Sequence, residues 1–444
     1  MSTNSSNVEK LRSRIDIDTD VSATLTDQEL EWKERINERL LEVLDLSLIE
    51  TIGEERARAE IRETANRLLA EADAPLSLRQ RQNVVKRIED EVMGLGPLEP
   101  LLSDIAVSDI LVNGHDTIYV ERRGRLERTN LRFSNHSHLM NTIDRIVSAV
   151  GRRVDESSPM VDARLKDGSR VNAIIPPLAI DGAVLSIRRF AVERLTMEMH
   201  EQLGTITPDV SRVMAAVVQG RLNVLVSGGT GAGKTTLLNI LSGFIPPTER
   251  IITIEDSAEL QLQQPHVVRL ETRPQNIEGK GEVTARDLVR NALRMRPERI
   301  VVGEVRGGEA LDMLQAMNTG HDGSLTTVHA NSARDALGRI ENMVSMTGIS
   351  FPMKALRSQI ASAIDVVVQV ARLEDGKRRV ISVQEINGME GEIVTMSELF
   401  TFERKGLDEN GNVRGELRPT GIVPAFYRDL SAKGINFPIE VFGQ

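Results

Sequence analysis

Apolar residues between about residue 26 and residue 93 recur at intervals of three and four, the spacing of one helix face. The apolar positions of the first run are Trp32, Ile36, Leu40, Leu41, Val43 and Leu44. The run opens on Thr26-Asp-Gln-Glu29, where the threonine hydroxyl and the glutamate carboxylate can each bond the other's backbone N–H, a capping box. Two more helical runs, 54–71 and 77–93, carry many Arg–Glu pairs. We therefore expect residues 26–93 to form a small helical domain with solvated charged faces.

The pattern changes after Gly94, Gly96 and Pro97, which interrupt the helical spacing. Short β-prone runs follow, separated by Gly, Asn and Asp: Ile110-Leu-Val, Thr117-Ile-Tyr-Val, Gly124-Arg-Leu, Arg170-Val-Asn-Ala-Ile-Ile and Val184-Leu-Ser-Ile. One helical run over 137–150 lies among them. This mixture predicts an α+β domain.

From about residue 209 onward, short apolar runs alternate with segments of helical spacing. The strand-like runs begin at Leu222, Arg250, Arg299 and Ser324, and the helical segments between them include 285–295 and 308–319. This alternation predicts an α/β domain with a mainly parallel sheet. Two later runs, Asp365–Val370 and Arg379–Val383, are expected to extend the sheet or to form a hairpin.

These patterns divide the chain into five parts: a flexible polar tail (1–25), a helical domain (26–93), an α+β domain (94–190), a linker (191–208) and an α/β domain (209–444).

Composition narrows the class of protein. The 444 residues are 40% hydrophobic and carry a net charge of −10, and only 3% are aromatic. Acidity and scarce aromatics argue against a nucleic-acid partner. The chain has no cysteine, which excludes disulfides and Cys-ligated metals. Neither a signal peptide nor a run of about 18–20 apolar residues is present, so we expect a cytoplasmic protein that reaches membranes only through partners.

One motif carries a specific chemistry. The glycine-rich run from residue 228 to 235 matches the P-loop pattern, follows an apolar strand and opens a helix. Its residues, with the next threonine, are Gly228, Gly229, Thr230, Gly231, Ala232, Gly233, Lys234, Thr235 and Thr236. Glycines let backbone N–H groups face the phosphates, Lys234 would reach the β- and γ-phosphates, and the Thr235 hydroxyl would bind Mg²⁺. We expect a nucleoside triphosphate here, with ATP more consistent than GTP because no Asn-Lys-x-Asp motif is present.

Acidic residues end two of the predicted strands. Glu255 and Asp256 follow one, and Glu304 follows another, so both should lie at the carboxyl edge of the sheet. A carboxylate there can activate water or hold Mg²⁺, and the residues alone do not rank the two glutamates. His329, with Thr326 and Thr327 before it, follows a further strand; it is either a structural hydrogen bonder or a reporter of the γ-phosphate.

Two groups of arginines have alternative interpretations. Arg286, Arg290 and Arg294 lie four apart on one helix face and form either a salt-bridged surface or a subunit contact. In the α+β domain, Arg170, Arg188 and Arg189 lie in otherwise apolar strands. They are either ordinary surface residues or arginine fingers that reach a phosphate.

Taken in order, four motifs resemble those of the type II/IV secretion ATPases. They are the P-loop, the Ile254-Glu-Asp acidic box, Val302-Gly-Glu-Val-Arg306, and Gly320-His-Asp-Gly-Ser-Leu-Thr-Thr-Val-His329-Ala-Asn. Three upstream segments resemble the CpaF branch of that family, which powers tight-adherence pili: Met93-Gly-Leu-Gly-Pro-Leu-Glu, Asp109-Ile-Leu-Val-Asn-Gly114 and Ser186-Ile-Arg-Arg-Phe190. The resemblance covers roughly residues 90–400.

The resemblance implies a ring-shaped hexamer of two-domain subunits with a RecA-like ATPase domain. It implies that Lys234 and Thr235 bind the phosphates and Mg²⁺, and that Glu304 is the Walker B acid that activates water and takes part in metal binding, with Glu255 as the second candidate. His329 would sense the γ-phosphate. Arg170, with Arg188 or Arg189, would act as an arginine finger. The implied partners are inner-membrane platform proteins of a pilus or secretion machine, on which the ring would act from the cytoplasm.

Other classes are less consistent with the sequence. An ABC-type ATPase needs an LSGGQ-like signature, which is missing, and a RecA-like helicase or DNA translocase fits poorly with the acidic charge. A nucleotide-dependent scaffold without turnover and a type IV secretion traffic ATPase remain alternatives. The absence of cysteine excludes the four-cysteine zinc module that is common in the pilus-extension and type II branches.

Overall fold

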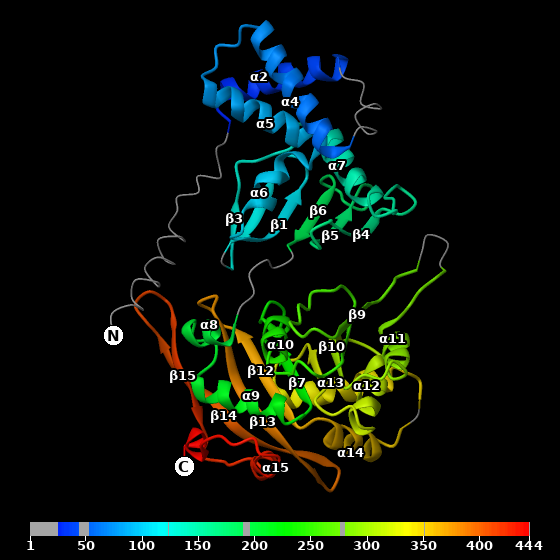
Figure 1. Cartoon of the computed structure of the whole chain (residues 1–444), viewed down its shortest axis with the longest axis vertical. Helices are drawn as coiled ribbons and strands as arrows, with labels where there is room; N and C mark the ends of the chain where they lie inside the picture. The colour runs from blue at the N-terminus through cyan, green and yellow to red at the C-terminus, as the bar shows by residue number, and fades with distance from the viewer. Residues whose placement is uncertain are drawn as a thin grey trace. The chain divides into compact units, whose positions relative to one another are not determined.

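The computed structural model describes residues 25–43, 53–122, 124–189, 196–275, 280–349 and 351–443 (Figure 1). The chain divides into two compact units, Met1–Val192 and Glu193–Gln444. The tail predicted over residues 1–25 lies outside the described part except for its last residue. Within that part, no helix is both long enough and apolar enough to cross a bilayer.

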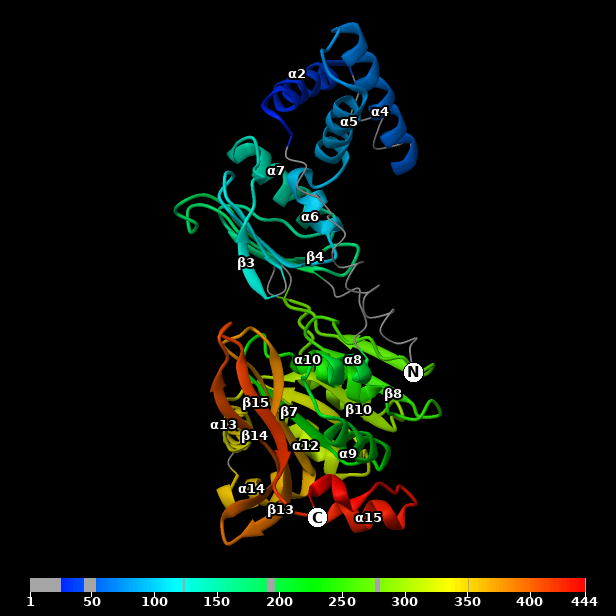
Figure 2. The same ribbon diagram turned by 90° about the vertical axis from the view of Figure 1, so that its left-hand side faces the viewer.

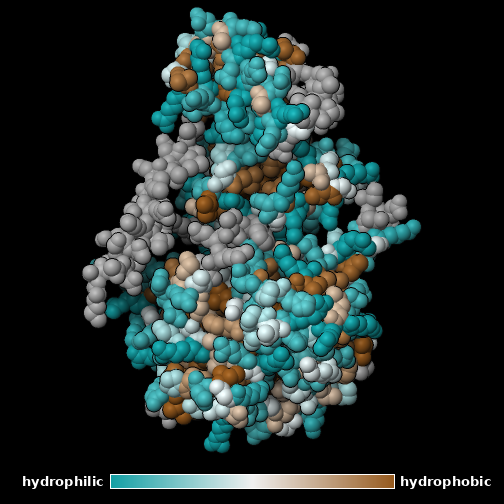
Figure 3. All heavy atoms as spheres, in the orientation of Figure 1, coloured by the Kyte–Doolittle hydropathy of each residue, from teal (hydrophilic) through white to brown (hydrophobic). Residues whose placement is uncertain are grey.

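The N-terminal unit begins with three helices that pack side by side: α2 (Asp27–Val43), α4 (Glu54–Glu71) and α5 (Leu78–Met93) (Figures 1 and 2). The predicted capping box is confirmed, since the Thr26 N–H donates to Glu29 Oε2 at 2.7 Å and the Glu29 N–H donates to Thr26 Oγ1 at 3.3 Å. Ile36, Ile61 and Ile88 lie in the shared core. The outer surface of these helices is mostly hydrophilic, as Figure 3 shows.

The rest of this unit is a six-stranded antiparallel sheet with the order β3-β2-β1-β6-β5-β4. Its strands are β1 (Val107–Asn113), β2 (Ile118–Arg122), β3 (Arg125–Arg128), β4 (Met160–Arg164), β5 (Arg170–Ile174) and β6 (Val184–Arg188). The short η1 (Gly96–Leu98) and helices α6 (Glu99–Ser103) and α7 (His136–Ser148) pack on one face of it and enclose a core with Phe133 at 0% exposure. Alternate strand residues therefore point either into this core or onto the open face.

The C-terminal unit is built on a nine-stranded mixed sheet with the order β15-β14-β13-β12-β7-β11-β10-β8-β9. The parallel part comprises β7 (Val224–Gly228), β8 (Ile251–Glu255), β9 (Val267–Glu271), β10 (Arg299–Val305), β11 (Leu325–Val328) and β12 (Val366–Arg372). The antiparallel part continues through β13 (Arg378–Glu390), β14 (Ile393–Leu407) and β15 (Val413–Pro419). Figure 2 shows these long strands, orange to red, along one edge.

Helices cover both faces of the parallel part, as expected for an α/β sheet. One core contains residues of α9 (Pro208–Gln219) and α10 (Lys234–Ser242), with Val224 and Val226 of β7. The other contains Leu225 and residues of α11 (Ala285–Ala292), α12 (Glu309–Asn318), α13 (Ala333–Ser345) and α14 (Met353–Ala363). The α/β fold class is therefore confirmed. Both alternatives expected for the run from Asp365 are observed, since β12 extends the sheet beside β7 and also forms a hairpin with β13.

Two shorter segments complete this unit. Helix α8 (Met197–Gln202) lies within the predicted linker, residues 191–208, whose first five residues are outside the described part. Helix α15 (Phe426–Ala432) and η2 (Ile439–Phe442) contribute Phe426 and Phe442 to the core that contains α9.

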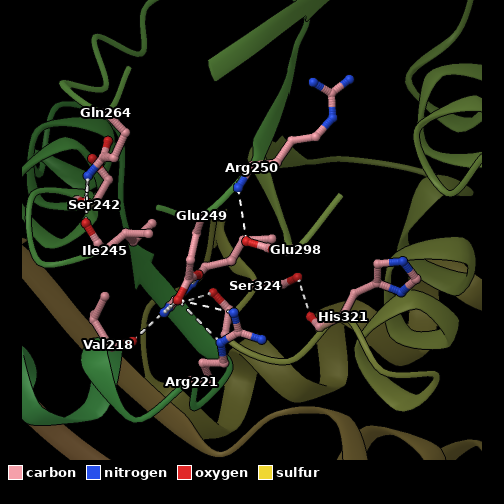
Figure 4. A network of polar contacts seen from close by, with 12 residues as sticks. Val218, Arg221, Ser242, Ile245, Glu249, Arg250, Gln264, Glu298, His321 and Ser324 are labelled. Atoms are coloured by element: carbon pink, nitrogen blue, oxygen red, sulfur yellow. Dashed lines mark hydrogen bonds and ion pairs between the residues drawn. The ribbon is translucent and has the colours of Figure 1, made fainter. Parts of the chain in front are cut away.

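A buried ion pair holds the edge of the sheet where β8 and β10 begin. Arg299, at 0% exposure, donates to both carboxylate oxygens of Glu249 at 2.5 and 3.2 Å, and to the carbonyl of Val218 at 2.7 Å. Arg221 approaches the same carboxylate from the surface at 3.2 Å. Figure 4 shows Glu249, Arg221 and Val218 converging. A buried charge is costly without partners, so Arg299 and Glu249 hold each other at the end of the sheet where β8 and β10 begin.

Candidate active site

The glycine-rich loop lies between the end of β7 and the start of α10, as predicted. Gly231 and Gly233 have φ values of 69° and 95°, in the left-handed region that glycine adopts without strain. At Gly228 a Cβ atom would stand 2.5 Å from the carbonyl oxygen of Val370 in the neighbouring β12. Thus three of the glycines are required by backbone geometry alone.

Lys234 is the first residue of α10 and is 7% exposed. Its Nζ donates to the carbonyl of Gly229 at 3.1 Å, so the side chain is folded over the loop. Burial lowers the pKa of Lys234, and the nearby Glu304 carboxylate opposes that shift. Thr235 and Thr236 follow in the first turn of α10, where the helix dipole favours an anion.

Glu304, in β10, is an acid whose carboxylate interacts electrostatically with Lys234 of the loop. Arg306 donates to Glu304 Oε2 at 2.8 Å and also approaches Asp256 Oδ2 at 3.3 Å. Burial raises the pKa of Glu304, but the hydrogen bond and charge of Arg306, with the charges of Lys234 and His329, outweigh it and lower that pKa below its ordinary value. The carboxylate is therefore ionised at neutral pH.

Glu255, at the end of β8, is in a different environment. It is 5% exposed, and its Oε2 accepts the backbone N–H groups of Glu259 and Leu260 at 2.6 and 2.8 Å. Its side chain packs against Gly303, where a Cβ would stand 2.9 Å from Glu255 Cγ. Burial raises the pKa of Glu255 despite these two hydrogen bonds. Glu255 thus braces the turn after β8, whereas Glu304 is the more exposed of the two acids.

His329, just after β11, lies beside Glu304, with 3.8 Å between His329 Nε2 and Glu304 Oε1. Burial, followed by the charge of Lys234, lowers the pKa of His329, so the ring is neutral at neutral pH. Thr327 donates to the Gly303 carbonyl at 2.7 Å, and Thr326 is fully buried. Thr327 therefore ties β11 to β10, whereas the buried Thr326 hydroxyl has no hydrogen-bond partner among the described residues.

The oxygen donors at this edge fit a magnesium ion. The candidate ligands are the Thr235 hydroxyl and the Glu304 carboxylate, and Mg²⁺ prefers oxygen donors while keeping several water or phosphate ligands. In the described residues, no group of three or more His, Cys, Asp or Glu could form a protein-only metal cage. Both candidate ligands offer oxygen, which is compatible with a metal that also binds water and phosphate.

The arginines of the N-terminal unit form a row on the open face of its sheet. Arg164, Arg170 and Arg188 face one another across β4, β5 and β6, and Asp109 of β1 ends the row. Arg188 donates to Asp109 Oδ1 at 3.0 Å. Like charges directly opposite each other in a sheet repel, so the row concentrates positive charge on this face, which the Asp109 carboxylate balances in part.

Arg189 differs from the members of that row, because its guanidinium donates to the backbone carbonyls of Asp104 and Val107. For Arg286 and Arg290 the salt-bridge interpretation is confirmed, since both bind the Asp312 carboxylate at 2.8 Å. Arg294 donates to the Arg290 carbonyl at 3.0 Å.

Sequence reasoning assigned no role to three residues near the loop. Arg306 joins two acidic strand ends, which a linear motif does not reveal. Gln369 of β12 donates to the Ala330 carbonyl at 3.2 Å, beside His329. Arg378 of β13 donates to the Gly231 carbonyl at 2.9 Å. Except for the Arg306–Glu304 pair, these contacts join residues far apart in the chain, so no spacing rule could have found them.

Comparison with known proteins gives consistent results. A family model described as "Type II/IV secretion system protein" matches residues 91–411. The chain is 42% identical over 312 residues to a Mycobacterium tuberculosis protein named "Putative conjugal transfer protein", covering 69% of this chain and 88% of that protein. It is 35% identical over 323 residues to the type IV secretion system protein PtlH of Bordetella pertussis, covering 66% and 95%. Among solved structures, the VirB11 ATPase of the Brucella suis type IV secretion system is 31% identical, with 68% and 96% covered and a TM-score of 0.36.

Proposed function

The chain belongs to the type II/IV secretion system protein family, and we propose that it is an ATP-hydrolysing motor. The observation that carries this proposal is the cluster at the carboxyl edge of the C-terminal sheet. Three side chains meet there closely enough for their charges to shift one another's pKa: Lys234 of the P-loop, an ionised Glu304 and a neutral His329. A lysine that binds phosphates and a carboxylate that positions water are two of the parts that recur in enzymes transferring phosphoryl groups.

In the proposed reaction, Lys234 leaves the Gly229 carbonyl and binds the β- and γ-phosphates of ATP. Thr235 and Glu304 would hold Mg²⁺, which neutralises phosphate charge when it is bound. Glu304 would orient the attacking water and accept its proton. We prefer Glu304 to Glu255 in this role because Glu255 is almost fully buried and already accepts two backbone N–H groups. His329, 3.8 Å from Glu304, would sense loss of the γ-phosphate through that contact.

We propose further that the motor is a homo-hexamer in which Arg170 and Arg188 reach the phosphates bound to a neighbouring subunit. Their position in an arginine row on an open sheet face supports this role. Arg189 is the alternative to Arg188 in this role, and its guanidinium donates to backbone carbonyls of its own unit. Cleavage of ATP would release these arginines and let the two units of a subunit move about the linker over residues 191–208.

For the biological task we propose assembly, and in some settings retraction, of a tight-adherence pilus. The ring would act from the cytoplasm on inner-membrane platform proteins, consistent with the upstream segments that resemble the CpaF branch. A second candidate is a type IV secretion or conjugal-transfer ATPase, favoured by the names of the M. tuberculosis and B. pertussis relatives. Deletion of the gene separates the two: loss of surface filaments with normal DNA transfer supports the pilus, and the converse supports transfer.

The shared site is tested by ATPase assays across protein concentrations, with particle mass measured in parallel. We expect activity per subunit to fall as the assembly dissociates, because monomers lack the neighbour's arginines. Mixing inactive Lys234→Ala subunits with inactive Arg170→Ala subunits should restore part of the activity, since a mixed ring contains some intact sites. Activity that stays constant down to monomeric dilution would refute the shared site.

A further inference from the structure

The hairpin between β12 and β13 contacts the crest of the P-loop, here defined as residues 229–233. Arg378 Nε donates to the carbonyl oxygen of Gly231 at 2.9 Å. Its side chain continues past Gly233, where a Cβ atom would stand 3.1 Å from Arg378 Cδ. The Arg372 guanidinium also lies near the crest, 3.7 Å from the Cβ position of Gly231. The hairpin therefore covers one side of the crest with arginine side chains.

The hairpin that carries Arg378 is held in place by a buried carboxylate. The Asp375 side chain is 1% exposed, and it accepts the Lys377 N–H at 3.0 Å and the Arg379 guanidinium at 3.0 Å. It also accepts the Val413 N–H of β15 at 3.0 Å, which fixes the turn to the outer strand. Such a turn holds the backbone of Arg378 beside the loop, so only side-chain freedom is lost when its hydrogen bond forms.

The α8 segment supports the hairpin from another direction. The Val380 N–H of β13 donates to the Thr205 carbonyl at 2.8 Å. His200 of α8 is 6% exposed, and its pKa is lowered by burial and then by the positive charge of Arg378. A neutral imidazole at neutral pH adds no repulsion, so Arg378 can remain against the loop.

The orientation of the Gly231 carbonyl affects how well the loop can bind phosphate. Phosphates are bound by backbone N–H groups, and a carbonyl oxygen that turns toward the anion repels it. Gly231 has a positive φ and no side chain, so the peptide that follows it can rotate with little steric cost. Holding the Gly231 carbonyl prevents that rotation.

We propose that Arg378 is a positioning residue for the nucleotide site, which locks the Gly231 carbonyl and so keeps the P-loop in its phosphate-binding conformation before the nucleotide arrives. The inference rests on the proposed nucleotide function of this loop. The proposed lock depends on the hydrogen bond from Arg378 to the Gly231 carbonyl more than on the positive charge of Arg378. Lysine at this position would keep the positive charge but lacks the planar Nε–H that reaches Gly231.

The test uses the full-length chain with Arg378→Ala and Arg378→Lys. Arg404→Ala is the matched control, because it also removes an arginine bound to this hairpin, where Arg404 pairs with Glu374 at 2.8 Å rather than with the loop. We would measure the Kd for ADP, and KM and kcat for ATP, in the presence of Mg²⁺. Hydrogen exchange of residues 228–234 would be measured without nucleotide, and melting temperatures would confirm folding.

Loss of one hydrogen bond that pre-orders the loop should raise the ADP Kd and the ATP KM together, by about fivefold, for both Arg378 variants. The value of kcat should stay within about twofold, since the lock acts before chemistry. Loop exchange should rise in both variants and not in Arg404→Ala.

Wild-type affinity in Arg378→Ala would overturn the proposal, because neither the hydrogen bond nor the charge would then be needed. Unchanged loop exchange in Arg378→Ala would overturn it as well, and so would a fall in kcat at constant KM. A wild-type chain that binds no nucleotide would refute the proposed function instead. The exchange comparison needs no nucleotide and would still decide the role of Arg378.

Discussion

Replacing Arg299 with methionine should destabilise the C-terminal unit more than any surface charge change. Arg299 is 0% exposed and makes hydrogen bonds to Glu249, Val218 and Gly323. Methionine fills a similar volume but donates no hydrogen bond. The Glu249 carboxylate, 7% exposed, would keep only its contact with Arg221, and the two carbonyls would lose a buried donor.

The magnitude follows from these contacts. Removing one partner of a buried ion pair costs about 3–5 kcal/mol. Because Arg221 remains beside Glu249, we expect the lower end, about 3 kcal/mol, and a fall in melting temperature of about 6–12 °C for a unit of this size. Arg221→Met is the control: Arg221 is 43% exposed at its side chain, and surface pairs are worth about 0–1 kcal/mol.

Acidification should reduce the difference between the wild-type protein and Arg299→Met. Burial raises the pKa of Glu249, but Arg299 and Arg221 lower it more, so its folded-state pKa lies below the ordinary value. Such a group stabilises the fold above its unfolded pKa, and this stability is lost as the pH falls through the folded pKa. The advantage of the wild-type protein should therefore shrink below about pH 4.

Differential scanning calorimetry of the full chain measures the effect, and hydrogen exchange of β10 peptides identifies the affected unit. A double-mutant cycle with Glu249→Gln should give less than the sum of the single effects by about 1–3 kcal/mol. If Arg299→Met melted within 2 °C of the wild-type protein, the buried network would contribute little to the stability of the C-terminal unit, and the reasoning would be refuted.

Two further predictions concern the same unit. Gly303→Ala should lower stability by about 1–3 kcal/mol, because its Cβ would stand 2.9 Å from Glu255 Cγ. Gly338→Ala is the control: a Cβ there would have nothing within 4 Å, so this variant should be neutral or stabilising. Equal melting temperatures of the two variants would contradict the prediction. Burial raises the pKa of Asp365 to about 6, against the hydrogen bond from the Asn223 N–H. The folded state thus resists its ionisation, so Asp365→Asn should be more stable than the wild-type protein at pH 7 by on the order of 2 kcal/mol. That gain should shrink as the pH falls from about 6 to about 4, and a gain that does not depend on pH would contradict the assignment.

The parallel strands could be predicted from sequence because each is a short apolar run buried on both faces. β7, β8, β10 and β11 are almost continuously buried, and each predicted run overlaps the observed strand. Strands β4 and β9, each at the edge of its sheet, were missed for the opposite reason. Neither strand has a fully buried residue, and charged residues interrupt the apolar positions of both, so neither gives a continuous apolar run.

The loop motif was predictable because its chemistry is local, from glycine conformation to the lysine at the helix start. The partners of that loop were not. Arg378 and Gly231 are separated by 147 positions, and only the folding of β12 beside β7 brings them together. In the same way, the difference between Glu255 and Glu304 lies in burial and neighbouring donors, which two similar strand ends do not reveal.

The proposed role of Glu304 is to activate water for ATP hydrolysis at this loop. Single-turnover hydrolysis of bound ATP by the wild-type protein, Glu304→Gln and Glu255→Gln, with ATP affinity measured in parallel, tests this role. We predict that Glu304→Gln binds ATP but hydrolyses it at least about 100-fold more slowly, and that Glu255→Gln loses less than about tenfold because its backbone contacts can persist. Hydrolysis by Glu304→Gln at the wild-type rate, with Glu255→Gln inactive, would contradict the account and assign the reaction to the buried acid.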